Sequence, residues 1–395
     1  MDHDNTLVLN CGSSSLKFAV LKAASGHSVI QGLAERLNSP QASLTFTIGD
    51  QKQTLSIPDH NHQQAIAAVI EVLKQEQLLT TLCGVGHRVV HGGEAFSESL
   101  LITSENLEQL TQLNQLAPLH NPVNILGIKA INALLPDLPQ VAVFDTAFHH
   151  SLPEAAYLYG LPYELYQQHG VRRYGFHGTS YRYVAAEAAR RLDKKQDDCH
   201  FLIAHLGNGC SACAVRNGKS VDTSMGFTPL EGLTMGTRSG DIDPGLMPFL
   251  SERLNLSIQD IMDVLNKQSG LLGLSGISND MREIQQAAQT GDIRANLAIE
   301  VFAFKIARYL GALAVSLPKI DALIFTGGIG ENDRLTRAMV LEHLAVLGFT
   351  IDGALNQENG DTQGRITTPN SPLALVIPTN EEWMIAQDTQ LLTAK

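Results

Sequence analysis

The stretch LVLNCGSSSLKF, residues 7–18, joins an apolar run to a turn of small polar side chains, which a lysine follows. Leu and Val favour a buried strand, whereas Gly12 and the three serines after it interrupt one. Three interpretations are open here: a nucleophilic serine or cysteine, a loop that cradles a phosphate, or an ordinary turn. Similar stretches elsewhere in the chain help to separate them.

The same pattern, an apolar strand that breaks into a glycine-rich polar turn, occurs again in FLIAHLGNGCS (201–211) and ALIFTGGIGEN (322–332). A fourth apolar run, VAVFDTAFH (141–149), ends in an aspartate instead. Hairpin patterns follow the first and second of the turns. Residues 17–37 contain a Ser-Gly-His turn, and residues 210–224 contain Asn-Gly, a strong hairpin signal. This recurrence predicts a structural duplication that gives two α/β domains.

Apolar residues at helical spacing predict helices over much of the remaining chain. These helices are expected at 62–79, 105–117, 180–192, 256–267, 281–289, 293–316 and 333–347. The predicted fold class is therefore α/β, with mixed sheets flanked by helices. We place the domain boundary near residue 150, in a segment rich in Pro, Gly and Tyr, so that the domains are 1–150 and 151–382. A helix at 383–395 is expected to pack back on the first domain.

Composition narrows the range of partners. The chain has 395 residues, 44% hydrophobic and 17% charged, which is typical of a globular protein with more than one domain. Its formal charge is −12, whereas nucleic acids and anionic membranes bind basic surfaces. The most apolar long segment, 293–317, contains charged side chains and is not expected to span a membrane. Because no secretory pattern is visible, we expect a cytoplasmic protein without nucleic-acid or membrane partners.

Two of the five cysteines, Cys210 and Cys213, form a C-x-x-C pattern. No second cysteine or histidine pair completes a zinc site, and the residues between the two cysteines are small and lie in an apolar run. Buried structural cysteines are therefore expected, rather than metal or redox chemistry.

The glycine-rich turns favour a phosphate ligand, because backbone N–H groups without side chains let an anion approach closely. Other nucleotide motifs do not match. The GKS at 218–220 lacks the upstream glycine of a Walker A loop, and neither GNGCSA nor GIGEND has the last glycine of a dinucleotide-binding turn. Three turns of this kind in one chain predict a nucleotide.

Two arginines lie in segments expected to be glycine-rich loops, Arg88 in GVGHRVVHGGE (84–94) and Arg238 in GLTMGTRSGDIDPG (232–245). Each can be a solvated surface residue, but the presence of two favours carboxylate or phosphate binding, which suits planar guanidinium groups. His177, in YGFHGTS, can be a satisfied core histidine or a donor aimed at a phosphoryl oxygen.

Acidic candidates follow two apolar runs, Asp145 in VFDTAF and Glu381 in PTNEEW. A carboxylate at the end of a strand in an α/β fold lies where ligands bind, although either residue could instead cap a helix. Since Mg²⁺ keeps many water ligands, one carboxylate and one amide, such as that of Asn10, would be enough to hold it.

Taken together, ten segments resemble one family, the acetate kinases. They are NCGSSSLKF, GHRVVHGG, APLHNP, FDTAFH, YGFHGTS, HLGNGCS, GFTPLEGLTMGTRSGDIDPG, SNDMRE, TGGIGEN and PTNEE. The resemblance runs from residue 10 to residue 382 in family order and so covers essentially the whole chain. One departure is visible: Tyr181 stands where the family usually has a second histidine, in FHGTSH.

The resemblance implies two ribonuclease-H-like domains with an ATP cleft between them, and a homodimer formed through the second domain. It implies acetate, acetyl phosphate, ATP and ADP as ligands, and Mg²⁺, for which Mn²⁺ can substitute. It further implies roles for individual residues. The implied catalytic residues are Arg88, Asp145, His177 and Arg238; the substrate pocket has Arg88, Val90, Leu119, Phe176 and Pro229; the metal ligands are Asn10 and Glu381; and the nucleotide contacts are Lys17, His205, Leu206, Gly207, Asn208, Gly209, Asp280, Met281, Arg282, Gly328, Ile329, Gly330, Glu331 and Asn332.

The implied reaction is reversible in-line transfer of a phosphoryl group from ATP to acetate. Because a carboxylic acid is ionised at pH 7, the nucleophile needs no general base, which favours Asp145 as an organiser of an arginine or of metal-bound water. The nucleophile interpretation of residues 7–18 therefore falls away. Propionate or another short-chain acid is the alternative substrate, and Val90 favours acetate. An actin-like or chaperone-like ATPase switch is the alternative class.

Overall fold

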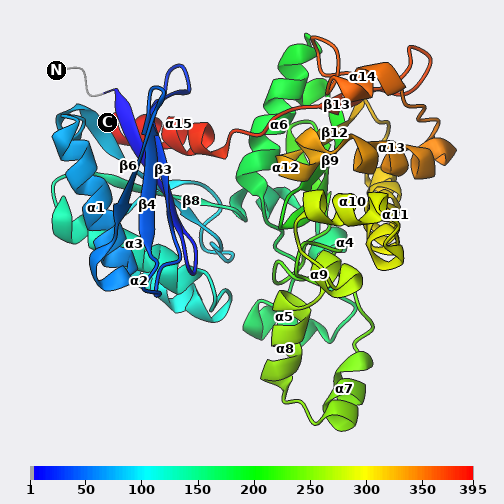
Figure 1. Cartoon of the computed structure of the whole chain (residues 1–395), viewed down its shortest axis with the longest axis horizontal. Helices are drawn as coiled ribbons and strands as arrows, with labels where there is room; N and C mark the ends of the chain where they lie inside the picture. Colours follow the sequence, from blue (N-terminus) through cyan, green and yellow to red (C-terminus); the bar gives the residue numbers. More distant parts are fainter. Residues whose placement is uncertain (1–3, 395) are drawn as a thin grey trace. The chain divides into compact units, whose positions relative to one another are not determined.

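The computed structural model describes residues 4–394 and divides the chain into two compact units. Unit 1 comprises Met1–Phe148 and Asn380–Lys395, and unit 2 comprises His149–Thr379. Residues 380–382, which the sequence analysis assigned to the second domain, thus belong with unit 1. Both units are mixed sheets flanked by helices, and the predicted α/β class is confirmed (Figure 1).

Unit 1 contains an eight-stranded sheet in the order β5-β4-β3-β2-β1-β6-β8-β7. Strands β5 to β1 are antiparallel neighbours, and β1, β6 and β8 are parallel. The elements are β1 (Asn5–Cys11), β2 (Leu16–Lys22), β3 (His27–Glu35), β4 (Ser43–Ile48), β5 (Gln51–Ser56), α1 (His62–Gln75), β6 (Leu82–Val89), β7 (Leu100–Leu101), α2 (Ser104–Gln112), α3 (Asn121–Leu134), β8 (Gln140–Phe144) and α15 (Glu381–Thr393).

Unit 2 contains a five-stranded sheet in the order β11-β10-β9-β12-β13. The hairpin strands are antiparallel, and β9, β12 and β13 are parallel. The elements are α4 (Glu154–Tyr157), α5 (Tyr163–His169), α6 (Gly178–Arg191), β9 (His200–Leu206), β10 (Cys210–Arg216), β11 (Lys219–Thr223), α7 (Leu246–Leu254), α8 (Ile258–Lys267), α9 (Gly270–Ser275), α10 (Met281–Gln289), α11 (Ile293–Leu313), β12 (Ala322–Thr326), α12 (Gly327–Asn332), α13 (Arg334–His343), α14 (Gly353–Gln357) and β13 (Ala374–Val376).

The duplication expected from the sequence is visible in the strand order. In unit 1 the run β3-β2-β1-β6-β8 has the same order and the same directions as β11-β10-β9-β12-β13 in unit 2. In each unit a hairpin precedes two parallel strands that extend the sheet on the other side. The glycine-rich turns after β1 and β9 therefore occupy corresponding places in the two sheets.

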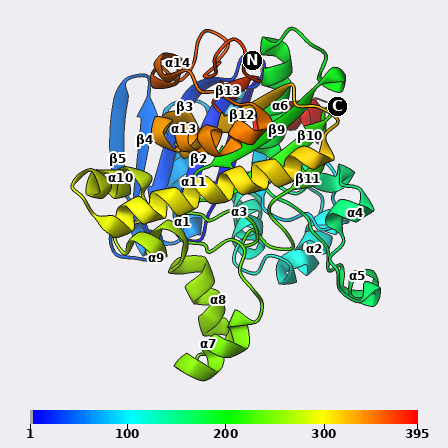
Figure 2. The same ribbon diagram turned by 90° about the vertical axis from the view of Figure 1, so that its right-hand side faces the viewer.

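Helices cover the sheets as apolar periodicity predicts. The long helix α11 lies across the sheet of unit 2 (Figure 2), and its residues Ile299, Phe302 and Ile306 are buried. In unit 1, α15 covers strands β1, β6 and β8, where Val8, Val141 and Ile385 share one apolar cluster. Among residues 4–394, no helix is both long and apolar enough to cross a membrane.

Two local predictions need correction. Residues 84–89, which the sequence analysis treated as part of a glycine-rich loop, lie in the buried strand β6. Its glycines admit helix α15: a Cβ at Gly84 would lie 2.9 Å from Thr393 Cγ2, and one at Gly86 would collide with Thr389. The other correction is the third glycine-rich turn, which forms the short helix α12 directly after β12.

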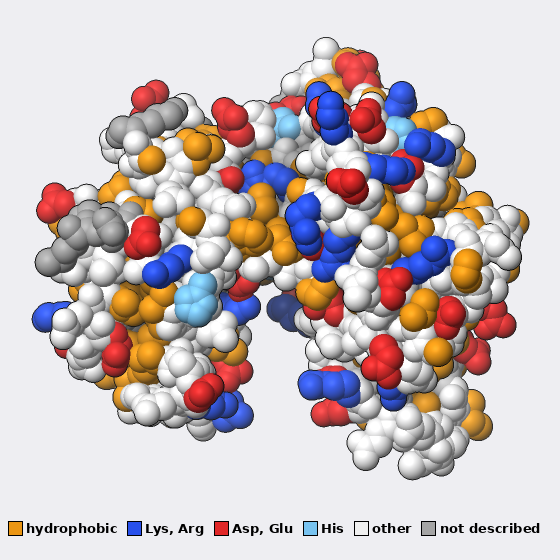
Figure 3. Space-filling view, turned by 90° about the horizontal axis from the view of Figure 1, so that it is seen from above, with side chains coloured by type: hydrophobic (Ala, Val, Ile, Leu, Met, Phe, Trp, Pro, Cys, Tyr) orange, Lys and Arg blue, Asp and Glu red, His pale blue; other side chains and the backbone are white. Residues whose placement is uncertain are grey.

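The charge is distributed without a single dominant sign on the face seen in Figure 3. Over unit 2, Lys and Arg side chains alternate with Asp and Glu. Together with the formal charge of −12, this face offers no broad basic surface for a nucleic acid.

Candidate active site

Three predicted site residues lie at the ends of adjacent parallel strands in unit 1. Asn10 lies at the end of β1, Arg88 at the end of β6, and Asp145 directly after β8. The backbone N–H of Asp145 donates to the carbonyl of Val89 at 3.0 Å, which continues the pairing of β6 and β8 by one residue. The carboxyl ends of parallel strands share one edge of the sheet, and this edge is where α/β folds bind ligands.

Arg88 and Asp145 form a bidentate ion pair. Arg88 Nε donates to Oδ1 at 2.9 Å, and Nη2 donates to Oδ2 at 2.6 Å. The Asp145 side chain is 2% exposed and that of Arg88 is 23% exposed. Burial alone would lower the pKa of Arg88, but the Asp145 carboxylate raises it above its usual value. The pair therefore holds a charged guanidinium in a fixed orientation.

The opening stretch, residues 7–18, forms the β1–β2 hairpin. Its turn is closed by the Gly12 N–H, which donates to the Ser15 carbonyl at 2.8 Å. Asn10 and Lys17 are direct cross-strand partners, so their side chains lie on the same face of the sheet. Lys17 also forms an ion pair with Glu382 in the first turn of α15. The turn interpretation of this stretch is confirmed, and its role toward phosphate stays a prediction.

Glu381 is the first residue of α15. Asn380 caps this helix, since its side-chain oxygen accepts from the Trp383 N–H at 3.1 Å. Burial, together with the nearby Asp145 and Glu382 carboxylates, raises the pKa of Glu381 to about 7. An acid held among other acids in this way favours the arrival of a cation.

In unit 2, strands β9 and β12 run parallel and end in the second and third glycine-rich segments. After β9, a tight turn is closed by the Gly207 N–H, which donates to the Gly209 carbonyl at 3.1 Å. After β12, Gly327 has φ +76° and fits against the backbone of Leu206, which allows α12 to start immediately. The two segments therefore lie side by side at the carboxyl edge of the sheet.

His177 and Arg238 converge on the turn after β9. A Cβ placed on Gly209 would lie 3.4 Å from His177 Nε2 and 3.7 Å from Arg238 Nη1. The His177 ring also stacks on His205 with 4.3 Å between ring centroids. Two cationic or hydrogen-donating groups thus meet a glycine turn whose backbone can approach an anion.

The segment that carries Arg238 is an irregular loop, as the sequence analysis predicted for 232–245. Asp241 closes it: its backbone N–H donates to the Gly232 carbonyl at 2.9 Å, and its side chain accepts from the Gly232 N–H at 2.8 Å. Arg238 Nη1 donates to the Pro229 carbonyl at 2.9 Å, which fixes the guanidinium beside a predicted substrate residue.

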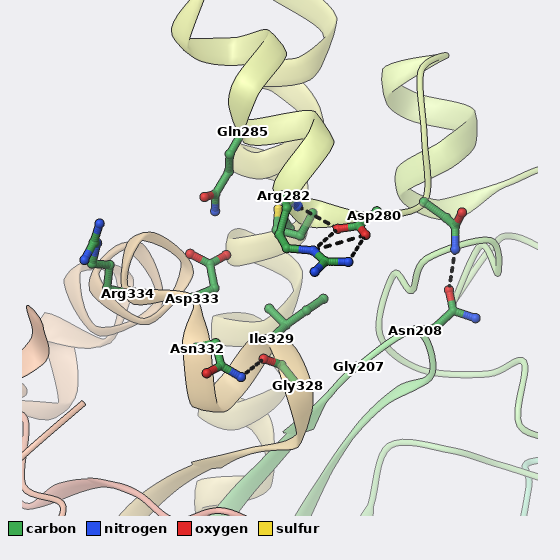
Figure 4. A pocket seen from close by; sticks show the side chains of 12 residues that line it. Gly207, Asn208, Asp280, Arg282, Gln285, Gly328, Ile329, Asn332, Asp333 and Arg334 are labelled. Carbon is green, nitrogen blue, oxygen red and sulfur yellow. Dashed lines mark hydrogen bonds and ion pairs between the residues drawn. The ribbon is translucent and has the colours of Figure 1, made fainter. Parts of the chain in front are cut away.

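A pocket of about 630 Å³ opens within unit 2 (Figure 4). Its walls come from the turn after β9, the start of α10 and the helix α12. Eight of the predicted nucleotide contacts line it, namely Gly207, Asn208, Asp280, Met281, Arg282, Gly328, Ile329 and Asn332. Gly328 leaves open space, since a Cβ there would meet nothing within 4 Å. Asp280 caps α10, and Arg282 forks back onto its carboxylate, with Nη2 to Oδ2 at 2.5 Å.

The other predicted nucleotide contacts of unit 2 are absent from that lining. His205 and Leu206 are buried in β9. The Gly330 carbonyl accepts from the buried Arg337 at 3.0 Å. The Glu331 side chain accepts from the backbone N–H groups of Gly327 and Thr379, so it supports α12 from behind.

Four further residues line the pocket that the sequence analysis did not single out: Asn279, Gln285, Asp333 and Arg334. Asn279 Nδ2 donates to Asn208 Oδ1 at 2.9 Å, which joins two walls. The Nε2 of Gln285 is buried and has no hydrogen-bond partner among residues 4–394, so it is an available donor. Helical spacing could have found Gln285, because it lies one turn after Met281 on the same helix.

The four apolar residues predicted for the substrate pocket have different surroundings. In unit 1, the Val90 N–H donates to Asn124 Oδ1 at 3.1 Å, and Leu119 is 53% exposed. In unit 2, Phe176 is buried and its carbonyl accepts from His149 Nε2 at 2.9 Å, while Pro229 is half-buried.

The predicted burial of Cys210 and Cys213 is confirmed. All five cysteines are free thiols, and Cys210 and Cys213 are fully buried, which raises the pKa of both thiols. Across the described part of the chain, His, Cys, Asp and Glu side chains nowhere gather in threes as metal ligands.

A repeated α/β sheet, glycine turns that collect arginine and histidine, and a pocket large enough for a nucleoside define a nucleotide-dependent phosphotransferase class. The model of the acetokinase family matches residues 5–387. This chain therefore belongs to the acetokinase family.

Individual relatives agree with that assignment. The acetate kinase of Ectopseudomonas mendocina is 53% identical over 99% of this chain and 100% of its own length. The crystal structure of Porphyromonas gingivalis acetate kinase matches with a TM-score of 0.93 at 44% identity, covering 98% of this chain and 99% of that one. A propionate kinase structure from Francisella tularensis matches with a TM-score of 0.95 at 46% identity, over 99% and 100% of the two chains.

Proposed function

We propose that this chain transfers the γ-phosphoryl group of ATP to acetate, reversibly, to give acetyl phosphate and ADP. Membership of the acetokinase family and the acetate kinases that match over the full length support this activity. The observation that carries the chemistry is the meeting of His177 Nε2 and Arg238 Nη1 at Gly209, next to the pocket lined by Gly207 and Asn208.

The acceptor needs no base. A carboxylate is ionised at pH 7, so its oxygen can attack the γ-phosphorus in line while the bond to the β-phosphate oxygen breaks. The difficulty is electrostatic, because two anions must approach and the equatorial phosphoryl oxygens gain charge. Arg88, Arg238 and His177 supply donors for those oxygens and for the carboxylate. Asp145, with both oxygens bound to Arg88, orients that arginine.

The residues proposed for Mg²⁺ fit a hard cation. Glu381 is a carboxylate whose pKa is raised to about 7 beside other acids, and Asn10 offers an amide oxygen at the end of β1. Mg²⁺ takes few protein oxygens and keeps water and phosphate ligands, so a cluster of three acids is not required. When bound, the ion supplies charge neutralisation at the phosphates, and Mn²⁺ could serve in its place.

ATP is proposed to bind in the pocket of unit 2, with its phosphates toward the turn after β9. The hydrogen bond that joins the Asn208 and Asn279 walls and the open space at Gly328 support a ligand there. Lys17 is proposed as a further phosphate contact, because it is the cross-strand partner of Asn10 and lies on the same face of the sheet as this proposed Mg²⁺ ligand.

We also propose a cytoplasmic homodimer formed through unit 2. Several large apolar side chains on α7 and near the start of α8 are exposed: Phe249 is 59% exposed, Leu254 58% and Ile258 65%. Figure 1 shows these two helices extending from the rest of unit 2. Apolar surface of this kind commonly marks a protein interface. Light scattering of the purified protein reports the oligomeric state directly.

The activity is tested by incubating the protein with ATP, Mg²⁺ and acetate, and trapping acetyl phosphate with hydroxylamine as the hydroxamate. Acetate-dependent hydroxamate and ADP are expected; ADP release without acetate would instead indicate an ATPase switch. Arg238→Ala should lower kcat by about 10³ to 10⁵-fold, as loss of a catalytic arginine does in phosphoryl transfer. Near-normal turnover in this variant would remove Arg238 from the mechanism.

The length of the acid is tested at Val90. One methylene in an apolar pocket changes binding by about 1–3 kcal/mol, so Val90→Ala should raise the kcat/KM for propionate relative to acetate by about 10-fold. The match to a propionate kinase structure makes propionate the second candidate substrate. An unchanged ratio of the two kcat/KM values would refute the placement of Val90 in the acid pocket.

A further inference from the structure

A buried chain of hydroxyl groups leads to His177. The Tyr181 hydroxyl is hydrogen-bonded to Ser211 Oγ, and Ser211 Oγ is hydrogen-bonded to His177 Nδ1 at 2.8 Å. Tyr181 and Ser211 are both 0% exposed. Tyr181 comes from α6, and Ser211 from β10, so two separate elements hold the imidazole.

The donor in each of these hydrogen bonds follows from how many hydrogens each group has and from its acidity. A serine hydroxyl has a single hydrogen to donate. A phenol is a much stronger acid than an aliphatic alcohol, so Tyr181 is the better donor to Ser211. Ser211 then directs its own hydrogen to His177 Nδ1, which must accept. In a neutral imidazole whose Nδ1 accepts, the hydrogen is carried by Nε2.

That Nε2 is the atom that faces the anion turn. It is the closest atom to a Cβ built on Gly209, at 3.4 Å, with Arg238 Nη1 beside it at 3.7 Å. The ring cannot easily rotate away, because it stacks on His205, which is itself hydrogen-bonded to Ser180 through Nδ1 at 2.9 Å. Geometry and proton count therefore point in the same direction: an N–H donor aimed at the turn.

The Tyr181 ring is held in place as well. The edge of the His149 ring contacts the Tyr181 ring, with 5.7 Å between ring centroids. Both nitrogens of His149 are hydrogen-bonded, Nδ1 to Ser220 Oγ at 2.8 Å and Nε2 to the Phe176 carbonyl at 2.9 Å. The buried His149 thus ties the tyrosine to the backbone segment that immediately precedes His177.

We propose that Tyr181 is a positioning residue that acts through Ser211 to fix His177 as the tautomer with hydrogen on Nε2, presented as a donor to a phosphoryl oxygen. This inference rests on the proposed function of His177 in phosphoryl transfer. Tyr181 does not touch the substrate; it selects which nitrogen of the imidazole carries the hydrogen.

The tautomer can be measured without any turnover. In the ¹⁵N-histidine-labelled protein, long-range ¹H–¹⁵N spectra distinguish a protonated from an unprotonated ring nitrogen, and the spectrum of His177→Gln identifies the signals of His177. The expected result is an unprotonated Nδ1 and a protonated Nε2 in the unaltered protein. Tyr181→Phe should give a mixture of both tautomers. Tyr183→Phe, a half-buried tyrosine on the same helix, is the matched control and should leave the spectrum unchanged.

The kinetic expectation is a fall in kcat of about 10-fold in Tyr181→Phe, smaller than the 10²–10³ that follows loss of a direct oxyanion donor, with KM for acetate and ATP little changed. A His177 with hydrogen on Nδ1, or a Tyr181→Phe protein with unaltered tautomer and kcat, would overturn the proposal.

Ser211→Ala is the second variant, for the case that Tyr181→Phe does not fold. It removes the central hydroxyl of the same series of hydrogen bonds and should give the same tautomer mixture. The experiments also distinguish failure of the proposed function from failure of the proposed role of Tyr181. If the unaltered protein forms no hydroxamate, the proposed function fails while the tautomer result still stands. If hydroxamate forms but the tautomer does not respond, only the role of Tyr181 is lost.

Discussion

The Arg88–Asp145 pair shows how one residue defines the role of another. Both carboxylate oxygens of Asp145 are bound to the guanidinium, at 2.9 and 2.6 Å, and the aspartate is almost completely buried. Both oxygens of this carboxylate are engaged by Arg88 through charge-assisted hydrogen bonds, which fix the orientation of the guanidinium. We propose that its role is to orient an arginine that can meet an anion.

Replacing Asp145 by Asn should therefore act on Arg88. We expect the free energy of unfolding to fall by about 3 kcal/mol, at the low end of the range for a broken buried pair because Arg88 is partly exposed. We also expect kcat to fall at every pH, with the shape of the pH–rate profile unchanged. Urea unfolding and kinetics from pH 6 to 9 measure the two effects. Asp137→Asn, an exposed carboxylate in unit 1, is the control, and loss of the acidic limb in Asp145→Asn would restore the proton-acceptor role.

Residue type alone indicated most of the charged candidates, but not their partners. Arginine among glycines suggested an anion ligand for Arg88 and Arg238, but near Arg88 the strand glycines Gly84 and Gly86 serve the packing of α15. The partners of His177 could not be predicted, since Ser211 lies 34 positions away and contacts it only because β10 passes beside the start of α6. Hydrogen bonds between distant segments leave no local pattern in a sequence.

Among the secondary-structure elements, helix α12 carries the nucleotide proposal. It begins directly after β12 with Gly327, and it presents Gly328 to the pocket with open space above it. A helix that starts without a loop can bring its first backbone groups close to a ligand. The lack of a side chain at Gly328 therefore leaves room for a ligand in the pocket.

Gly328→Ala tests this placement. The backbone at Gly328 needs no left-handed conformation, and the added methyl group meets no protein atom within 4 Å, so the protein should fold normally. The methyl group should, however, occupy space needed by the nucleotide and weaken ADP binding by about 10-fold, within the usual cost of overpacking of about 1–3 kcal/mol. Calorimetry without acetate measures the affinity. Gly353→Ala, at an exposed glycine of α14, is the matched control; equal affinities in the two variants would place the nucleotide elsewhere.

Element prediction succeeded where periodicity was strong. The helices expected at 281–289 and 293–316 are α10 and α11, within three residues at each end. The helix α3 was not predicted, because its apolar residues are distributed around the helix instead of along one face, and Gly127 weakens the helical signal. Gly127 is required by packing: a Cβ there would lie 2.6 Å from Cys11 Sγ. Tertiary contact, which a single sequence does not display, decides such positions.

Across the whole chain, the pH dependence of stability should reflect Glu381. Its pKa is about 7 in the folded protein, against a usual value of 4.5, so the folded state holds the proton more tightly than the unfolded state. Stability from this group is therefore present below pH 4.5 and is lost as the pH rises toward 7.

Glu381→Gln removes this titration. Its unfolding free energy should decline less between pH 4.5 and 7 than that of the unaltered protein, and Mg²⁺ should stabilise the variant less at pH 8. Denaturant unfolding at a series of pH values gives the slope. Glu358→Gln, an exposed acid in unit 2, should leave the slope as it is. Identical slopes for Glu381→Gln and the unaltered protein would contradict the assignment.

The contact between helix α15 and the glycines of β6 has a consequence for how the protein is made. Strands β1, β6 and β8 leave the ribosome early, yet the helix that covers their apolar face follows the whole of unit 2 in the sequence. All of unit 2, which ends at Thr379, is therefore synthesised before the final segment of unit 1. During translation, unit 1 must therefore wait with an uncovered face, and the nascent chain is vulnerable to aggregation until α15 has been synthesised.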